Sequence, residues 1–315
     1  MENIKVGIWN NELARRQGYK LIDQLKTMGV KANFEIETIQ TKDHYSLSSY
    51  DTVYMDPRRR NNIDIQHSLQ EQAIDLAVFS LTEASLYVQD DFILATFLER
   101  GDSRHAYIGR THIPLHELPE ASVVGLRNER MAAFFKACYP QLEPVVMKEF
   151  IYDEIERLRR GAYDGIVLSV FDLKQLNLLE MVTEYIDLDT LLPEAGQGVL
   201  AVKCRKEDER LIQLLQKLND PKTETYSRAE REFVRLLDED YMAPICVHAW
   251  EEMEQIRLQG AICAIDGTGL LRVDVTGDDW KQVARKAVDK ALTLGAGEMI
   301  ERAKEVIFLQ QSRKF

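Results

Sequence analysis

Two pairs of residues in this sequence have types and spacing that could do chemistry. His112 and His116 are four residues apart, as metal ligands on one helix face are, but Pro114 lies between them and prevents that helix. Gly196 and Gly198 form a GxG, yet a dinucleotide-binding turn needs a third glycine and a following helix, and an apolar strand follows here. We interpret the first pair as surface histidines and the second as a tight turn, and we predict no metal.

A run of cations and a set of thiols are the other candidates. The arginines 58–60 stand in the polar segment 41–62, which we predict to be a mobile surface loop whose charges are solvated. The cysteines show no CxxC pairing, so neither a zinc knuckle nor a disulfide framework is indicated. They are Cys138, Cys204, Cys246 and Cys263. A reduced, cytoplasmic protein is the simplest interpretation.

The amino-acid composition and the net charge limit the classes of partner that we expect for this protein. The chain has 315 residues, of which 45% are hydrophobic and 29% charged, which is typical of a folded globular protein of two or three domains. A net charge of −12 disfavours polyanions, so we expect neither nucleic acid nor an anionic membrane as a partner. The start lacks the apolar core of a secretory signal, and no apolar run reaches the roughly 18 residues of a bilayer span.

Alternating strands and helices must position any site. Residues 4–9 and 33–39 are predicted strands around an amphipathic helix that Gly29 closes, which is a β-α-β start. Residues 75–81 and 165–171 are predicted buried strands, and Gly161 ends the helix before the second one.

From Pro221, which Asp220 can cap, the pattern changes to strands followed by a long helix starting at Trp280. We therefore predict an α/β fold with a separate α+β domain at its end.

In its order of segments the chain resembles the porphobilinogen deaminase, or hydroxymethylbilane synthase, family. The stretches that carry the resemblance are 75–80, Leu98-Glu99-Arg100 with Asp102 and Arg104, 163–168, 192–200, and 219–233 with Ala229-Glu230-Arg231. The resemblance implies two β-α domains like those of periplasmic binding proteins, with a chain crossover, and a small third domain. The expected boundaries are 1–98 with 199–219, then 99–198, then 220–315.

The family joins four porphobilinogen molecules on a dipyrromethane primer that is thioether-bonded to a cysteine. An aspartate handles the proton transfers, and arginines bind the carboxylates of the growing chain in an interdomain cleft. Guanidinium groups suit that task because they hold carboxylates in a fixed bidentate geometry. A thiolate suits the anchor because it is a strong nucleophile.

This sequence departs from the family pattern at the anchor and at the base. The resemblance places Tyr241 at the anchor position, where no thioether can form, and Cys246 five residues on shares a strand face with it only if no bend intervenes. Glu83 stands at the aspartate position, one methylene longer, and Thr82 replaces a lysine.

Most cations of the family cleft are replaced as well. At ligand-contacting positions the chain has Asn11 where a serine is expected, Arg130 as the one remaining member of an arginine pair, and Lys148. Arginines are replaced by Trp9, Met131, Glu154 and Gln175. We interpret Trp9, Phe79 and Met131 as packing residues, and we expect Glu154 to bring an unpartnered carboxylate that weakens binding of polycarboxylates.

Three interpretations follow. The first is a silent or repurposed protein that binds an unidentified small molecule in the cleft, with no cofactor and with a protein partner left open. The second is an active transferase that holds its primer non-covalently or through Cys246, with Glu83 as acid and base. The third is a structural subunit whose cleft is filled by Trp9, Phe79 and Phe150.

Overall fold

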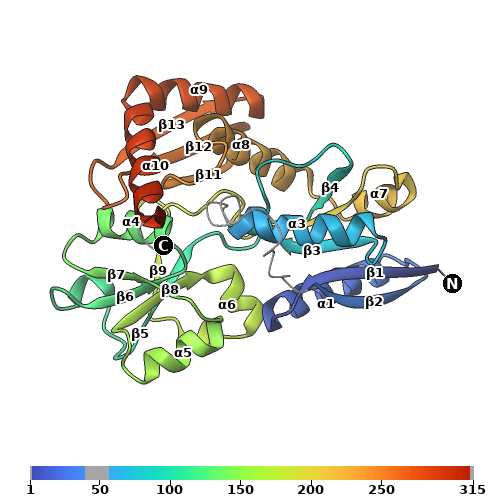
Figure 1. Cartoon of the computed structure of the whole chain (residues 1–315), viewed down its shortest axis with the longest axis horizontal. Coiled ribbons are helices and arrows are strands. Elements are labelled where there is room, and N and C mark those ends of the chain that lie inside the picture. Colours follow the sequence, from blue (N-terminus) through green and yellow to red (C-terminus); the bar gives the residue numbers. More distant parts are fainter. Residues whose placement is uncertain (1, 40–56, 313–315) are drawn as a thin grey trace. The chain divides into compact units, whose positions relative to one another are not determined.

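The computed structural model describes residues 2–39 and 57–312 of the chain, which form two compact units (Figure 1). Unit 1 comprises Met1–Gly101 and Gly198–Thr225, and unit 2 comprises Asp102–Gln197 and Tyr226–Phe315. The chain therefore leaves unit 1 and returns to it through the predicted GxG turn. The boundaries expected for three domains stay a prediction.

Unit 1 is built on one mixed sheet. Its strands are β1 (Glu2–Trp9), β2 (Ala32–Ile39), β3 (Leu76–Ser80), β4 (Phe92–Phe97) and β10 (Leu200–Arg205), in the order β2-β1-β3-β10-β4. β1 runs parallel to β2 and β3, and the returning strand β10 runs antiparallel to β3 and β4. Helix α1 (Glu12–Thr27) packs on β1 and β3, which confirms the predicted β-α-β start.

The predicted surface loop is wrong in its last part. Helix α3 spans Pro57–Gln70, so Arg58 and the residues after it are helical, whereas residues 41–56 lie outside the described part of the chain. Proline suits the first position of a helix, and Ile65 and Leu69, four residues apart, are buried. The polar run 58–62 hides this periodicity because the apolar face begins only after it. Two shorter helical elements complete unit 1, namely the 3-10 turn η1 (Leu81–Glu83) and α7 (Glu209–Gln216).

The first sheet of unit 2 repeats the same design. Its order is β7-β6-β8-β5-β9, with β6 (Val123–Leu126) parallel to β7 (Glu143–Val146) and β8 (Gly165–Ser169), and β5 (His105–Gly109) antiparallel to β8 and β9 (Glu184–Ile186). Its helices are α4 (Glu129–Cys138), α5 (Ile151–Arg159) and α6 (Val170–Leu176), with 3-10 turns η2 (Leu115–Glu117) and η3 (Leu179–Met181).

Two expectations about this sheet are settled by backbone detail. Gly161 has φ of 83° just after α5, which confirms it as the left-handed helix end. The strand predicted to reach residue 171 ends at Ser169 instead, because the Ser169 hydroxyl accepts a hydrogen bond from the Asp172 N–H at 3.3 Å and caps α6.

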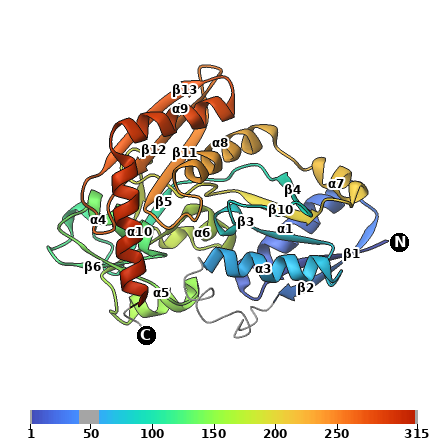
Figure 2. The same ribbon diagram turned by 45° about the horizontal axis from the view of Figure 1, so that its top comes forward.

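The end of the chain forms a third, antiparallel sheet. It consists of β11 (Ile245–Glu252), β12 (Gln255–Ile262) and β13 (Leu271–Gly277), preceded by α8 (Pro221–Leu237). The Asp220 carboxylate accepts a hydrogen bond from the Thr223 N–H at 2.6 Å, which confirms the predicted helix start. The predicted long helix is in fact two, α9 (Trp280–Thr293) and α10 (Ala296–Ser312), separated by Gly295 with φ of 95° (Figure 2).

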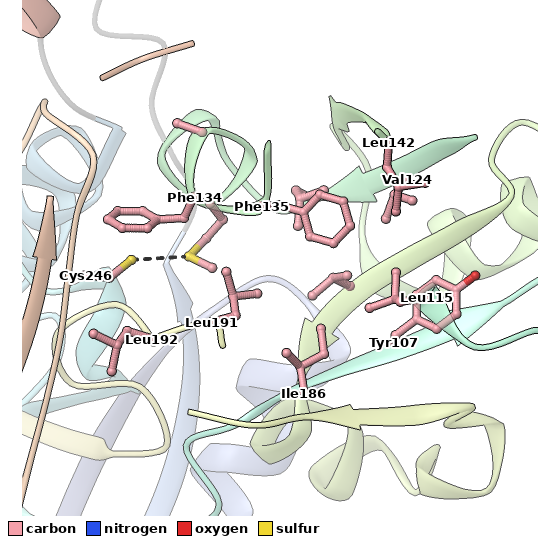
Figure 3. Packing of buried hydrophobic residues seen from close by; sticks show 14 of the residues in the cluster. Tyr107, Leu115, Val124, Phe134, Phe135, Leu142, Ile186, Leu191, Leu192 and Cys246 are labelled. Carbon is pink, nitrogen blue, oxygen red and sulfur yellow. Dashed lines mark hydrogen bonds between the residues drawn. The ribbon is translucent and has the colours of Figure 1, made fainter. Parts of the chain in front are cut away.

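The fold is thus α/β with a final antiparallel sheet, as predicted. The core of unit 2 joins its two sheets through α4, whose Phe134 and Phe135 pack in one cluster with Cys246 of β11 (Figure 3). Cys263, which directly follows β12, belongs to the same cluster. Among the described residues no helix is long and apolar enough to span a membrane, and no group of three metal-ligating side chains occurs. His112 and His116 are exposed.

Candidate functional site

In both mixed sheets the parallel strands end at one edge, and such carboxyl edges are where α/β proteins bind ligands. In unit 1 the edge follows β1 and β3. Trp9, the last residue of β1, is 8% exposed and packs in the core. The Asn11 side chain accepts a hydrogen bond from the Ala14 N–H at 2.8 Å and so caps α1. Phe79 is buried within β3, so Trp9 and Phe79 both pack inside unit 1.

The 3-10 turn η1 carries the position of the predicted acid and base. Ser80 ends β3, and its hydroxyl lies 2.9 Å from that of Thr82 in a hydrogen bond. Glu83, the last residue of the turn, is half-buried. A carboxylate therefore stands in the turn that directly follows this parallel strand.

In unit 2 the side chain of Tyr241 turns into the protein. It is 3% exposed, and its hydroxyl donates to the Ile245 carbonyl at 3.2 Å and accepts from the Ala195 N–H at 3.4 Å. The residue has φ of 52°, a left-handed conformation that puts a bend between it and β11. Strand alternation therefore does not extend from Cys246 back to Tyr241.

Arg130 connects Tyr241 to two further polar residues. Its Nε donates to Glu194 Oε1 at 3.1 Å, its Nη1 donates to the Tyr241 carbonyl at 2.8 Å, and its guanidinium lies 4.7 Å from the centroid of the Tyr241 ring. Asn128, the N-cap of α4, donates to Glu194 Oε2 at 2.9 Å. We call these four residues the Arg130 network. Because Glu194 neutralises Arg130, the one arginine left from the pair is bound within the protein.

Cys246 lies in the hydrophobic core of unit 2. It is fully buried, and its Sγ donates to Met131 Sδ at 3.8 Å, the contact drawn as a dashed line in Figure 3. Burial raises the pKa of the Cys246 thiol well above its usual 9.0, so the thiol stays protonated at neutral pH. Met131 is 3% exposed and packs in the same core cluster as Cys246.

The turn between β7 and α5 differs from expectation. Lys148 is exposed there, and Phe150 is 60% exposed, so Phe150 does not fill a cavity. Glu154 was expected to face a ligand as an unpartnered carboxylate, but its side chain is fully buried. It accepts hydrogen bonds from the backbone N–H groups of Lys148 and Glu149 at 2.9 and 2.8 Å. That expectation was wrong because the side chain points into unit 2.

Helix α6 completes this edge. Gln175, at an arginine position of the family, is half-buried on α6. Asp172, on the same helix, was missed by the sequence analysis. Burial raises its pKa to about 6, although the Arg127 charge acts in the opposite direction. The sequence does contain a signal for this buried acid, namely a single carboxylate within the otherwise apolar stretch 170–173.

Glu194, a member of the Arg130 network, and His105 were also missed. Glu194 precedes the first glycine of the GxG turn by two residues and was covered only as part of the stretch 192–200. His105 is 5% exposed, and its Nδ1 has no hydrogen-bond partner among the described residues. Burial lowers the pKa of His105 to about 4, against the opposing effect of the Glu194 carboxylate. A histidine that begins a buried strand gives no pattern that separates it from a core residue.

The residues present do not fit a thioether-bound dipyrromethane. Tyr241 has no thiol, and its phenol is already hydrogen-bonded inside unit 2. The thiol of Cys246 is inaccessible and protonated. A sulfur nucleophile must be reachable by the reactant and must be ionised to the thiolate, so neither residue is a suitable anchor.

These features define an α/β protein whose two mixed sheets end in edges of the kind that bind ligands. The residue at the anchor position, Tyr241, has its side chain buried inside unit 2. A family model described as porphobilinogen deaminase, dipyromethane cofactor binding domain, matches residues 4–213. A porphobilinogen deaminase of Oceanobacillus iheyensis is 32% identical over 309 residues, covering 97% of this chain and 99% of the relative. One of Staphylococcus aureus strain RF122 is 32% identical over 307 residues, with coverage of 97% and 99%. The chain belongs to the porphobilinogen deaminase family.

Solved structures show weaker likeness. A TRAP periplasmic solute binding protein from Desulfovibrio salexigens is 11% identical with a TM-score of 0.41, over 69% of this chain and 72% of that one. A BvgS VFT2 domain of Bordetella pertussis, a double mutant, is 13% identical with a TM-score of 0.40, over 69% and 86%. The fold assignment rests on the sheets themselves and on the family match.

Proposed function

We propose that this protein is a member of the porphobilinogen deaminase family that has lost the standard polymerisation of porphobilinogen and has become a silent or repurposed ligand-binding protein. The observation that carries the proposal is the Arg130 network. It uses the side chain at the anchor position and the remaining arginine of the pair for internal contacts, so neither is left to hold a primer or a substrate carboxylate.

The proposed ligand is a small molecule with fewer carboxylates than the family substrate. At positions where the family resemblance places an arginine, Trp9 and Met131 are core residues and Glu154 is a buried acid. Lys148 stays exposed and cationic. At the family's ligand positions in the described part of the chain, Lys148 is an exposed cation that can pair with one carboxylate, whereas a growing pyrrole chain brings two carboxylates with each ring. We further propose a cytoplasmic protein without nucleic-acid or membrane partners, which its net charge of −12 favours.

The alternative is an active transferase with a non-covalent primer, in which Glu83 acts as acid and base. Its support is the half-buried carboxylate of Glu83 at the end of β3 and the names of the relatives. The same alternative with Cys246 as anchor is disfavoured by the burial and raised pKa of that thiol.

Intact mass and turnover separate the two functions. We expect purified protein to have the mass of its sequence, both before and after incubation with porphobilinogen, and to release no ammonia above the uncatalysed rate. The porphobilinogen deaminase of Oceanobacillus iheyensis, treated identically, serves as the reference. A dipyrrole mass increment, or ammonia release that Glu83→Gln abolishes, would establish the transferase and end the proposal.

A matched variant tests the anchor itself. Tyr241→Cys restores the family's side chain but leaves Glu83, Met131 and Glu154 unchanged. We expect this variant also to stay at its sequence mass after incubation with porphobilinogen, because a thiol turned into unit 2 as Tyr241 is has little access to a reactant. If it acquires a dipyrrole, the anchor residue alone accounts for the loss and the Arg130 network does not close the position.

A further inference from the structure

Glu154 is a buried carboxylate in a position that the family resemblance assigns to an arginine. Its side chain has an exposed fraction of 0%, although α5 lies at the surface of unit 2 and neighbouring Asp153 is exposed. Burying a charged carboxylate is costly unless hydrogen bonds and opposite charge replace its water. The groups around Glu154 must therefore supply that replacement.

Four donors from three parts of unit 2 surround the carboxylate. Oε1 accepts from the N–H groups of Lys148 and Glu149 at 2.9 and 2.8 Å. Oε2 accepts from the Tyr163 hydroxyl at 2.9 Å and forms an ion pair with Arg157 Nε at 3.4 Å. Consistent with this contact, burial and the Glu154 hydrogen bond raise the pKa of Tyr163. Both oxygens are satisfied, as in a well-formed carboxylate site.

The two amide donors lie at the carboxyl edge of the sheet. They follow the edge strand β7, which runs parallel to β6, and β6 in turn runs parallel to β8. Backbone N–H groups at such an edge, together with a guanidinium, are suited to anions. Here the chain's own side chain occupies them.

We propose that Glu154 is a specificity-determining residue whose carboxylate takes the place of a ligand carboxylate at the β7–α5 turn. The ligand of this protein then carries no carboxylate at this place. This inference rests on the proposed function and specifies the chemical class of the proposed ligand. The exposed side chains next to the turn agree with this assignment. Val146, Phe150 and Tyr152 are 37%, 60% and 42% exposed, so the turn offers a ligand apolar contacts in place of anion-binding amides.

Rescue by a free carboxylate tests the proposal. Glu154→Ala removes the side chain beyond Cβ and leaves room for acetate, which has the same carbon and oxygen atoms as the removed group. At pH 7.5, we expect 100 mM acetate to raise the Tm of Glu154→Ala by about 2–4 °C more than it raises that of the wild type. Glu154→Gln is the matched control because its amide fills the space, and it should respond as the wild type does. Chloride at equal ionic strength should produce no such difference.

Two outcomes would overturn the proposal. One is an equal acetate effect on all three proteins, which would be a general salt effect. The other is no effect on Glu154→Ala at any concentration up to 500 mM, which would mean that the donors do not form a site without Glu154.

A second measurement applies if Glu154→Ala does not fold. In Glu154→Gln one carbonyl oxygen replaces two charged acceptors, so the amides of Lys148 and Glu149 should exchange hydrogen at least tenfold faster than in the wild type. The amides of Ile166 and Val167 in β8 should exchange unchanged. Unaltered exchange at Lys148 and Glu149 would contradict the assignment. Neither experiment measures porphobilinogen turnover, so its failure is distinguishable from failure of the proposed function.

Discussion

The two sheet edges are built in different ways. At the unit 1 edge Ser80 and Thr82 contact each other, and Glu83, the next residue in the chain, is half-buried. In unit 2 the polar contacts join residues that are distant in the sequence, because Arg130 binds Glu194 and Tyr241, which are 64 and 111 residues away. The contacts at the first edge are local to one turn, whereas those at the second form a network across the chain.

This difference bears on how readily each edge could be altered by substitution. A site that has only changed side chains can be restored by changing them back. A site whose replacements have become part of the hydrogen bonding and packing of the core resists restoration, because each reversal also removes structural contacts. We therefore expect variants of the Arg130 network to affect stability far more than variants of the unit 1 edge.

The largest effect is expected for Arg130→Ala. It leaves Glu194, whose side chain is 9% exposed, without its ion pair, and removes the guanidinium from the Tyr241 ring. Breaking a buried pair by removing one partner costs about 3–5 kcal/mol, which urea unfolding followed by circular dichroism would measure. Arg110→Ala is the matched control, because its 3.1 Å pair with Asp164 is 44% and 37% exposed and should contribute at most about 1 kcal/mol. Equal losses would mean that the network is an ordinary surface contact.

His105 gives the second largest effect, and it depends on pH. Its folded pKa of about 4 lies below the unfolded value of about 6.5, so between these values the unfolded chain binds more protons. Stability is therefore lost as the pH falls from 6.5 to 4, by up to about 3 kcal/mol, and the contribution is constant above pH 7. In urea unfolding at pH 7.5 and pH 5, His105→Gln should lose less stability than the wild type between the two conditions. Parallel losses would show that His105 is not held neutral beside Glu194.

The residues alone predicted those structural features of the two units that depend on a local sequence pattern. The cap at Asp220 and the glycine end at Gly161 follow from residue type and position. Periodicity also carries a signal about Glu154. Ile151, Ile155 and Leu158 define the buried face of α5, and Glu154 lies on that face, three residues after the first and four before the last. A charged residue on a buried face has to find partners inside the protein.

The partners of Arg130 could not be predicted in this way. Family resemblance assigns a position to a residue, but it does not say which way the new side chain points. Tyr241 turns inward because its backbone adopts φ of 52°, and no single-residue pattern predicts that conformation for a tyrosine. Contacts across such separations depend on the tertiary fold, which is where prediction from the residues alone ends.

Tyr241→Phe tests the inward phenol with a smaller effect. The variant keeps the ring beneath Arg130 but removes the hydroxyl contacts with Ile245 and Ala195, at 3.2 and 3.4 Å. Both contacts are long, so we expect a loss of about 1 kcal/mol in the free energy of unfolding. Tyr241→Ala, which also removes the ring, should lose several times more. If the two variants lose the same amount, the ring does not pack against Arg130 as described.

The smallest effect is expected at the edge of unit 1. Thr82→Val keeps the shape of the side chain and removes one hydrogen bond, the 2.9 Å contact with the Ser80 hydroxyl. Thr82 is half-buried, so water can reach part of the site, and we expect a loss of about 0.5 kcal/mol, at the lower end for one hydrogen bond. Urea unfolding under the conditions used for Tyr241→Phe allows a direct comparison. If Thr82→Val costs more than Tyr241→Phe, the unit 1 edge is as firmly built as the Arg130 network. Restoring the family's residues there would then be no easier than at the anchor.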